Sequence, residues 1–332
     1  MRAWGYGAAL ICAMATGAAA QVADDPFPTL SVVAENDGYF GSDDNYTSGL
    51  RLSYLSGNSP LEAGSRFLAR GILGFDAPLE DMRMRRGFAI GQQIYTPDDL
   101  TVSGPLPDQQ PYAGYLYGEA SLLIEQAGRV DQVALQLGVV GPSALGEAVQ
   151  NGFHAILGRE DAQGWDNQIE NAPAVTLSYD RQRRILASRY GYGLGWDVIP
   201  AFGLSLGTVE TSLRGGVTFR LGENLKAGYG PPRVRPALAG SGFFTPEGQR
   251  SWYVFAGVEG RAVAHNIFLD GSLFRADDPS VTSRVFVGDF QAGAAVQLLG
   301  TQLGFTYVQR SREFKELDGP QTFGAISLST RF

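Results

Sequence analysis

The C-terminal stretch reads Gln321-Thr322-Phe323-Gly324-Ala325-Ile326-Ser327-Leu328-Ser329-Thr330-Arg331-Phe332. Apolar side chains are interleaved here with glycine, serine and arginine in the period of two that is typical of a strand. A barrel strand that faces lipid on one side and a polar lumen on the other has this pattern, and a terminal aromatic resembles the assembly signal of outer-membrane barrels. We therefore expect an all-β fold, a transmembrane antiparallel β-barrel inserted by the barrel assembly machinery.

Further strand-like segments occur along the whole chain, and many are joined by turns that contain glycine or asparagine. The count is twelve to fourteen, and periplasmic termini require an even number, so we expect twelve strands. The other candidates are 28–36, 46–57, 84–95, 111–124, 130–140, 170–181, 188–207 (one strand or two), 209–221, 250–264, 267–275, 283–299 and 301–312.

Three longer connections interrupt the strand pattern, at residues 96–110, 141–169 and 222–249. Long connections of such barrels are normally extracellular, so we expect all three at that end. Residues 145–157 have a helical pattern, which predicts a short helix in the second connection. Since there is no internal repeat and no linker, residues 21–332 are expected to form a single barrel domain.

The N-terminus predicts a cleaved secretory signal over residues 1–20. A single arginine precedes an apolar run that ends in Ala18-Ala19-Ala20, a typical arrangement for cleavage before Gln21. The only cysteine, Cys12, lies inside this segment, so the mature chain would contain none. Ile11 occupies the position where a lipoprotein signal requires a small residue, which disfavours lipid attachment.

The composition also excludes some classes of partner. The formal net charge is −8 and the pI is about 4.9, values that disfavour non-specific binding to nucleic acid. Charged residues make up only 18% of the chain, and 44 glycines accompany 11% aromatic residues. Low charge with many glycines and aromatics suits barrel strands with aromatic girdles. We expect a monomer embedded in outer-membrane lipid.

Two polar clusters flank the first predicted hairpin. Glu35-Asn36-Asp37 ends the first strand, and Asp43-Asp44-Asn45-Tyr46-Thr47-Ser48-Gly49 begins the second. Both should lie at one rim, where carboxylate and amide oxygens are suitable ligands for Ca²⁺ or another hard divalent cation. The alternative is a solvated loop in which Asp and Asn simply favour turns.

A third cluster, Gln150-Asn151-Gly152-Phe153-His154, lies in the predicted loop helix. Gln150 and His154 are four residues apart and would share one helix face. A neutral imidazole is a suitable general base near neutral pH, although a surface histidine without function is the alternative. The other histidine, His265, lies in a predicted turn, and we assign it no role.

Many short blocks in order resemble the outer-membrane lipid A 3'-O-deacylases and their uncharacterised relatives. The resemblance rests on the first and third clusters and on Asn45-Tyr46-Thr47-Ser48-Gly49 of the second. The other blocks are Tyr95-Thr96-Pro97, Pro111-Tyr112-Ala113-Gly114, Gly138-Val139-Val140-Gly141-Pro142-Ser143, Gly164-Trp165-Asp166-Asn167-Gln168, Phe268-Leu269-Asp270-Gly271 and Arg312-Glu313-Phe314-Lys315. It covers essentially the whole mature chain.

This resemblance implies a twelve-stranded barrel with an active site at the lumen mouth, facing the outer leaflet of the bacterial outer membrane. The implied activity is Ca²⁺-dependent hydrolysis of an acyloxyacyl ester of lipid A, the anchor of lipopolysaccharide. The residues that carry over are Asn36, Asp37, Thr47, Gln150 and His154. Asn36 and Asp37 would hold the metal, and His154 would activate water while the metal stabilises the oxyanion.

One departure from the family pattern concerns a basic residue. The family has a lysine in the loop after the third strand, but no Lys, Arg or His occurs from Gly87 to Ala127. Arg51, Arg159 or a second metal charge are the candidate substitutes.

Two other functions remain open from the sequence. A non-catalytic, porin-like or structural barrel would be consistent with the missing lysine but leaves the Asn36-Asp37 and His154 blocks unexplained. A serine hydrolase is disfavoured, since Ser143 lies in a Gly-Pro turn with no evident link to His154.

Overall fold

The computed structural model describes residues 22–332, except 41–44, 76–77, 190–192, 235–239 and 246–247. The predicted signal and its cleavage after Ala20 therefore lie outside the described residues, as do Asp43 and Asp44.

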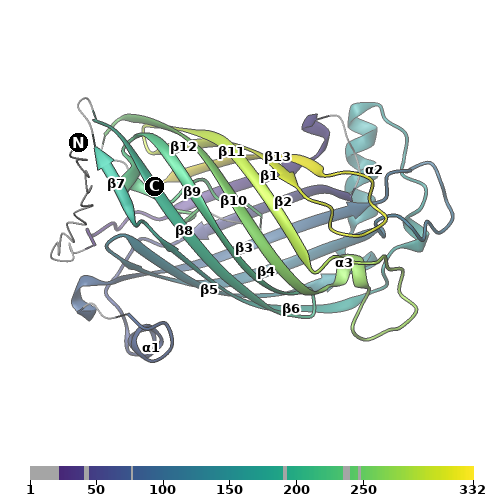
Figure 1. The fold of residues 1–332 in the computed structure, drawn as a ribbon, viewed down its shortest axis with the longest axis horizontal. Helices are drawn as coiled ribbons and strands as arrows, with labels where there is room; N and C mark the ends of the chain where they lie inside the picture. The colour runs from purple at the N-terminus through teal and green to yellow at the C-terminus, as the bar shows by residue number, and fades with distance from the viewer. Residues whose placement is uncertain (1–21, 41–44, 76–77, 190–192, 235–239, 246–247) are drawn as a thin grey trace, which may run out of the picture.

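The described residues form thirteen strands in one antiparallel sheet that closes on itself (Figure 1). β6 and the four-residue β7 lie one after the other along β8, so they share one position and the barrel has twelve, as predicted. The strands are β1 (Thr29–Asn36), β2 (Asn45–Leu55), β3 (Arg83–Thr96), β4 (Ala113–Gln126), β5 (Arg129–Val140), β6 (Ala172–Arg183), β7 (Leu186–Arg189), β8 (Leu194–Gly207), β9 (Glu210–Glu223), β10 (Arg250–Asn266), β11 (Phe286–Leu298), β12 (Thr301–Arg310) and β13 (Gln321–Arg331).

Side chains alternate across the barrel wall. In β1, Leu30 and Val32 are exposed on the outside, whereas Ser31 and Glu35 are buried toward the lumen. The same alternation gives the outside an apolar surface along most strands, which suits contact with lipid. The lumen instead contains buried ion pairs, such as Arg51–Glu119 at 2.7 Å.

The two ends of the barrel follow from strand pairing. Thr29 at the start of β1 pairs with Arg331, and Asn36 at its end pairs with Gly324. The first residue of β1 and the last residue of β13 therefore lie together at one end of the barrel, which we take as periplasmic. The opposite, extracellular end carries α2 (Gly146–Leu157) and α3 (Ile267–Asp270), whereas α1 (Ala63–Phe67) lies at the periplasmic end (Figure 1).

Residues 222–249 were expected outside the cell, and this expectation is wrong. β9 runs toward the periplasmic end and β10 starts there, so their connection is periplasmic. From its short helix η7 (Leu225–Ala227) the chain turns into the lumen, where Phe243 packs against Leu55 and Leu123. We call the described residues of 224–249 the plug segment.

A second periplasmic connection, residues 56–82, was not predicted to be structured. It contains α1, the π-helical turn η2 (Leu68–Ile72) and the 3-10 turn η3 (Leu79–Asp81). Its apolar residues Leu61, Leu73 and Phe75 pack against Met84 of β3 and Ile124 of β4. Residues 56–82 thus cover part of the wall at the periplasmic end, whereas the plug segment fills part of the lumen.

The predicted strand at 267–275 is also wrong, because the chain forms α3 there. The Asn266 side chain accepts a hydrogen bond from the Phe268 amide at 3.1 Å and so caps a one-turn helix. Gly271 follows with φ of 75° and ends it. Among the described residues, no helix has both the length and the apolar character needed to cross a membrane.

Candidate active site on the outer wall

The extracellular ends of β1 and β2 bring the first polar cluster together with residues 45–49 of the second, as predicted. The Asn36 amide donates to the Thr47 carbonyl oxygen at 2.9 Å, and the Asp37 backbone amide donates to the same oxygen at 3.3 Å. Asp37 is buried, and the turn η1 (Gly38–Phe40) follows it. A Cβ at Gly38 would lie 2.6 Å from Asn36 Oδ1, so glycine makes room for the carboxamide.

A β-bulge at Thr47 determines the side of the wall to which this residue of β2 points. Tyr46 pairs with Tyr95 and Ser48 with Ile94, which leaves Thr47 as the extra residue. Tyr46 and Tyr95 both line a cavity in the lumen. Thr96 follows Tyr95 and points the other way, and its hydroxyl lies 2.7 Å from that of Thr47. Asn36, one residue after the inward-facing Glu35, likewise points outward.

The predicted loop helix is α2, which begins at Gly146 and ends at Leu157. Leu145 precedes it in the left-handed region, and Gly158 ends it with φ of 67°. The amphipathic pattern of α2 is inverted. Its buried face carries Gln150 and His154, and its exposed face is apolar, formed by Val149, Phe153, Ile156 and Leu157.

Helix α2 sits on the outer surface of β3 and β4. Gly114 of β4 allows the close approach, because a Cβ there would lie 3.1 Å from the Gly146 backbone nitrogen. The outward-facing Gln92 donates to the Ala144 carbonyl oxygen at 2.6 Å. Ile94, also outward-facing, packs in one buried cluster with Tyr112 and Trp165. The 3-10 turns η4 (Pro142–Ala144) and η5 (Trp165–Asn167) flank the helix in the chain.

Two contacts orient the buried side chains of α2. His154 Nδ1 lies 2.7 Å from the Glu160 carbonyl oxygen. Because a carbonyl can only accept, Nδ1 carries the proton of the neutral ring and Nε2 carries the lone pair. The Trp165 indole donates to Gln150 Oε1 at 2.9 Å. Gln150 Nε2 is buried and has no hydrogen-bond partner among the described residues.

These contacts connect the three clusters along one surface. Thr96 holds Thr47, and Ile94, two residues earlier on the same face of β3, packs against Trp165, which holds Gln150. The site was expected at the lumen mouth, and the structure corrects this. Its residues gather on the outer side of the wall, below a helix whose other face is apolar.

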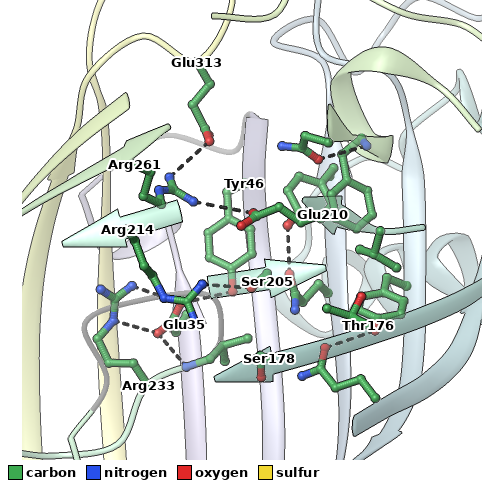
Figure 2. Close-up of a pocket in the computed structure, with 18 of the residues that line it drawn as sticks. Glu35, Tyr46, Thr176, Ser178, Ser205, Glu210, Arg214, Arg233, Arg261 and Glu313 are labelled. Carbon is green, nitrogen blue, oxygen red and sulfur yellow. Dashed lines mark hydrogen bonds and ion pairs between the residues drawn. The ribbon is translucent and has the colours of Figure 1, made fainter. Parts of the chain in front are cut away.

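The lumen holds a separate cavity with a network of charged side chains. In Figure 2, Arg233 reaches Glu35, and Arg261 lies between Glu210 and Glu313. Arg214 instead donates to the Ser205 hydroxyl at 2.9 Å. Arg51 is buried in the lumen against Glu119, so it does not bring a positive charge to the site on the outer wall. Arg159 is exposed, and its backbone amide donates to the His154 carbonyl oxygen at 2.9 Å, so it lies next to the site.

Oxygen atoms at the rim are the available ligands for a cation. Within the described residues, no three His, Cys, Asp or Glu side chains gather closely enough to hold a metal ion. Asn45 Oδ1 is buried without a hydrogen-bond partner among them, and Asn45 Nδ2 donates to Asp98 at 3.2 Å. Burial, with Asp318 adding to it, raises the pKa of Asp98 above its ordinary value, while the Asn45 hydrogen bond opposes the shift.

Sequence reasoning missed several residues of this site. Thr96, Trp165 and Asp98 received no role, although the first two lie in blocks that carry the family resemblance.

Ser143 was disfavoured as a nucleophile, and its backbone amide binds Asn171 on the exposed surface. His265, on β10, lies 3.1 Å from the Thr208 carbonyl oxygen through Nε2.

The family model described as outer membrane protein LpxR matches residues 8–332. The chain belongs to this family. It is an integral outer-membrane protein with an LpxR-like barrel. Among solved structures, LpxR from Salmonella typhimurium is 21% identical with a TM-score of 0.73, covering 92% of this chain and 100% of its own.

Two other barrels match less well. The β domain of the Bordetella autotransporter BrkA is 10% identical with a TM-score of 0.44, covering 93% of this chain and 99% of its own. The translocator domain of NalP from Neisseria meningitidis is 10% identical with a TM-score of 0.39, covering 94% and 90%. No curated protein matched the sequence.

Proposed function

We propose that this LpxR-family member is a hydrolase that removes an ester-linked acyl or acyloxyacyl chain from lipid A in the outer leaflet. The observation that carries the proposal is the outward position of Gln150 and His154, between the barrel wall and an exposed apolar helix face. A substrate dissolved in the periplasm or passing through the lumen would not meet this surface. A lipid of the outer leaflet would.

His154 would act as the general base. Its Nε2 takes a proton from water while Glu160 holds Nδ1, and the resulting hydroxide forms a bond to the ester carbonyl carbon. The bond between that carbon and the sugar or acyl-chain oxygen then breaks. His154 returns the proton to the departing oxygen, which leaves a fatty acid and an alcohol.

Gln150 would stabilise the negative charge on the carbonyl oxygen. Trp165 fixes Oε1 of the amide, so Nε2 is the end that remains to donate. A donor placed in advance where charge develops costs no reorganisation during the reaction. Thr47 and Thr96 would fix the rim beside it, since their paired hydroxyls join β2 to β3.

The rim also fits Ca²⁺ or another hard divalent cation. Asp37 and Asn36 would hold it, with Asn45 Oδ1 as a further oxygen that lacks a donor among the described residues. The bound cation would supply positive charge for the oxyanion. Because few carboxylates are present, we expect weak binding, with a dissociation constant of about 10⁻⁴–10⁻³ M, as in extracellular calcium modules.

The test uses purified protein in mixed micelles with lipopolysaccharide. We expect release of free fatty acid with Ca²⁺, loss of release with a chelator, and recovery when Ca²⁺ returns. Release that is unaffected by the chelator would refute the metal assignment, and no release under any condition would refute the hydrolase. The porin-like alternative is disfavoured by the plug segment in the lumen, and it predicts steady channel conductance in planar bilayers instead.

A further inference from the structure

Glu35 is the lumen-facing residue directly before Asn36 and Asp37. Its carboxylate accepts hydrogen bonds from Arg233 Nε, from the Val234 backbone amide and from the Tyr46 hydroxyl, each at 3.0 Å (Figure 2). Successive residues of a strand point to opposite sides of the barrel wall. Glu35 bonds to Tyr46 on the lumen side, and the next residue, Asn36, belongs to the outward-facing rim. Glu35 thus links contacts in the lumen to the rim on the other side of the wall.

Arg233 and Val234 belong to the plug segment, which enters from the periplasmic end. Arg184 and Arg220 hold its start through the Leu225 carbonyl oxygen, at 2.9 and 2.7 Å. Farther along, the Gly240 amide donates to the Pro231 carbonyl oxygen at 3.1 Å. Pro231 lies against β12, as a Cβ at Gly304 would be 2.7 Å from its own Cβ. The segment therefore reaches from the periplasmic end to the extracellular half of β1.

The Arg233–Glu35 pair is deeply buried, with 3% and 1% of the two side chains exposed. When one partner of such a pair is removed, the other remains as an uncompensated buried charge, which favours a local rearrangement that exposes it to water. The residue that would move is Glu35. Any displacement of its backbone is passed directly to Asn36 and Asp37.

We propose that Arg233 is a positioning residue. The plug segment, anchored at the periplasmic end, acts through Glu35 to hold the outer-wall arrangement of Asn36, Asp37 and Thr47. The effect on hydrolysis rests on the function proposed above, whereas the effect on the rim does not. Contacts inside the lumen would thereby stabilise a site on the outer surface of the barrel.

The test compares Arg233→Met with Arg214→Met, since both remove a buried lumen arginine from an ion pair. For Arg233→Met we expect faster hydrogen exchange at the Asp37 amide, weaker Ca²⁺ binding by calorimetry, and kcat lowered about 10–100-fold, as is typical when a supporting residue is lost. Arg214→Met should leave these three properties within about twofold of the parent, because Arg214 binds Asp180 on β6 and not β1.

Charge removal on both sides gives a second check. Arg233→Met combined with Glu35→Gln leaves no uncompensated charge, so exchange at the Asp37 amide should return toward the parent value. If Arg233→Met does not fold, Arg233→Lys keeps the charge but loses the second donor, and a smaller rise in exchange is expected. Unchanged exchange in a folded Arg233 variant overturns the proposal. Altered exchange in a protein that never hydrolyses lipid A would refute the proposed function alone.

Discussion

Replacement of Trp165 by phenylalanine should slow lipid A hydrolysis about tenfold and leave the barrel folded. The indole NH is the donor that fixes Gln150 Oε1, at 2.9 Å in a buried contact. Phenylalanine keeps much of the ring packing against Tyr112, whose ring centroid lies 5.0 Å away. The change therefore removes mainly one hydrogen bond, and the Gln150 amide becomes free to rotate.

The magnitude follows from that single bond. A buried acceptor left without its donor costs about 1–3 kcal/mol. If rotation of the amide relieves this cost, the Gln150 orientation that donates to the oxyanion becomes rarer by the same free energy. Since about 1.4 kcal/mol corresponds to tenfold in rate, we expect a loss of roughly tenfold. It should lower kcat and kcat/KM together, because the bond matters in the transition state.

The assay is fatty-acid release from lipopolysaccharide in mixed micelles, with heat-modifiable gel mobility as the check on folding. The matched control is Trp252→Phe, a tryptophan on the outer, lipid-facing side of β10 with 42% exposure. It should retain parent activity. If Trp165→Phe retains parent kcat while folded, Gln150 does not depend on Trp165 and the oxyanion role loses its support.

Three further predictions concern the lipid, the metal and the N-terminus. Phe153→Asp or Ile156→Asp should reduce hydrolysis in membranes but spare a short-chain ester in detergent, because the apolar face of α2 would be charged and the buried face kept; equal losses on both substrates would contradict a lipid-contacting helix. Asp37→Asn should weaken Ca²⁺ binding at least tenfold by calorimetry, since it removes a ligand charge, and unchanged binding would remove Asp37 from the metal site. Intact mass should show a mature chain that begins at Gln21, and a start displaced by more than a few residues would reject cleavage after Ala20.

Much of the fold was predictable because barrel strands have a strict period. The alternation over residues 323–332 predicted β13, and the helical pattern at 145–157 predicted α2 to within one residue. Periodicity failed at 267–275, where Phe268 and Leu269 looked like strand residues but a cap at Asn266 starts a helix. It also could not identify the plug segment, because the end at which a connection lies depends on an exact strand count.

The residues of the candidate site were proposed from the sequence, but the side of the barrel wall on which they lie was not predicted. The rim cluster and the α2 pair occur at the same end, as the parity of the strands indicated. Thr47 faces outward because of a bulge that shifts the alternation of β2 by one residue and leaves no clear trace in the sequence. The α2 pair lies outside because the helix packs on the outer face of β3 and β4, at Gln92 and Gly114. The roles of Trp165 and Glu35 depend on contacts between distant segments, which local patterns do not show.

The most direct test of the central claim is mass spectrometry of lipid A from cells that express the parent chain, His154→Ala or His265→Ala. His154 would be the base on the outer wall, and a positioned base contributes about 10²–10⁴-fold to rate. We predict that the parent and His265→Ala produce lipid A that lacks an acyl or acyloxyacyl chain, and that His154→Ala leaves lipid A intact although it folds and inserts. Parent-level deacylation by His154→Ala, or intact lipid A with the parent chain, would contradict the account.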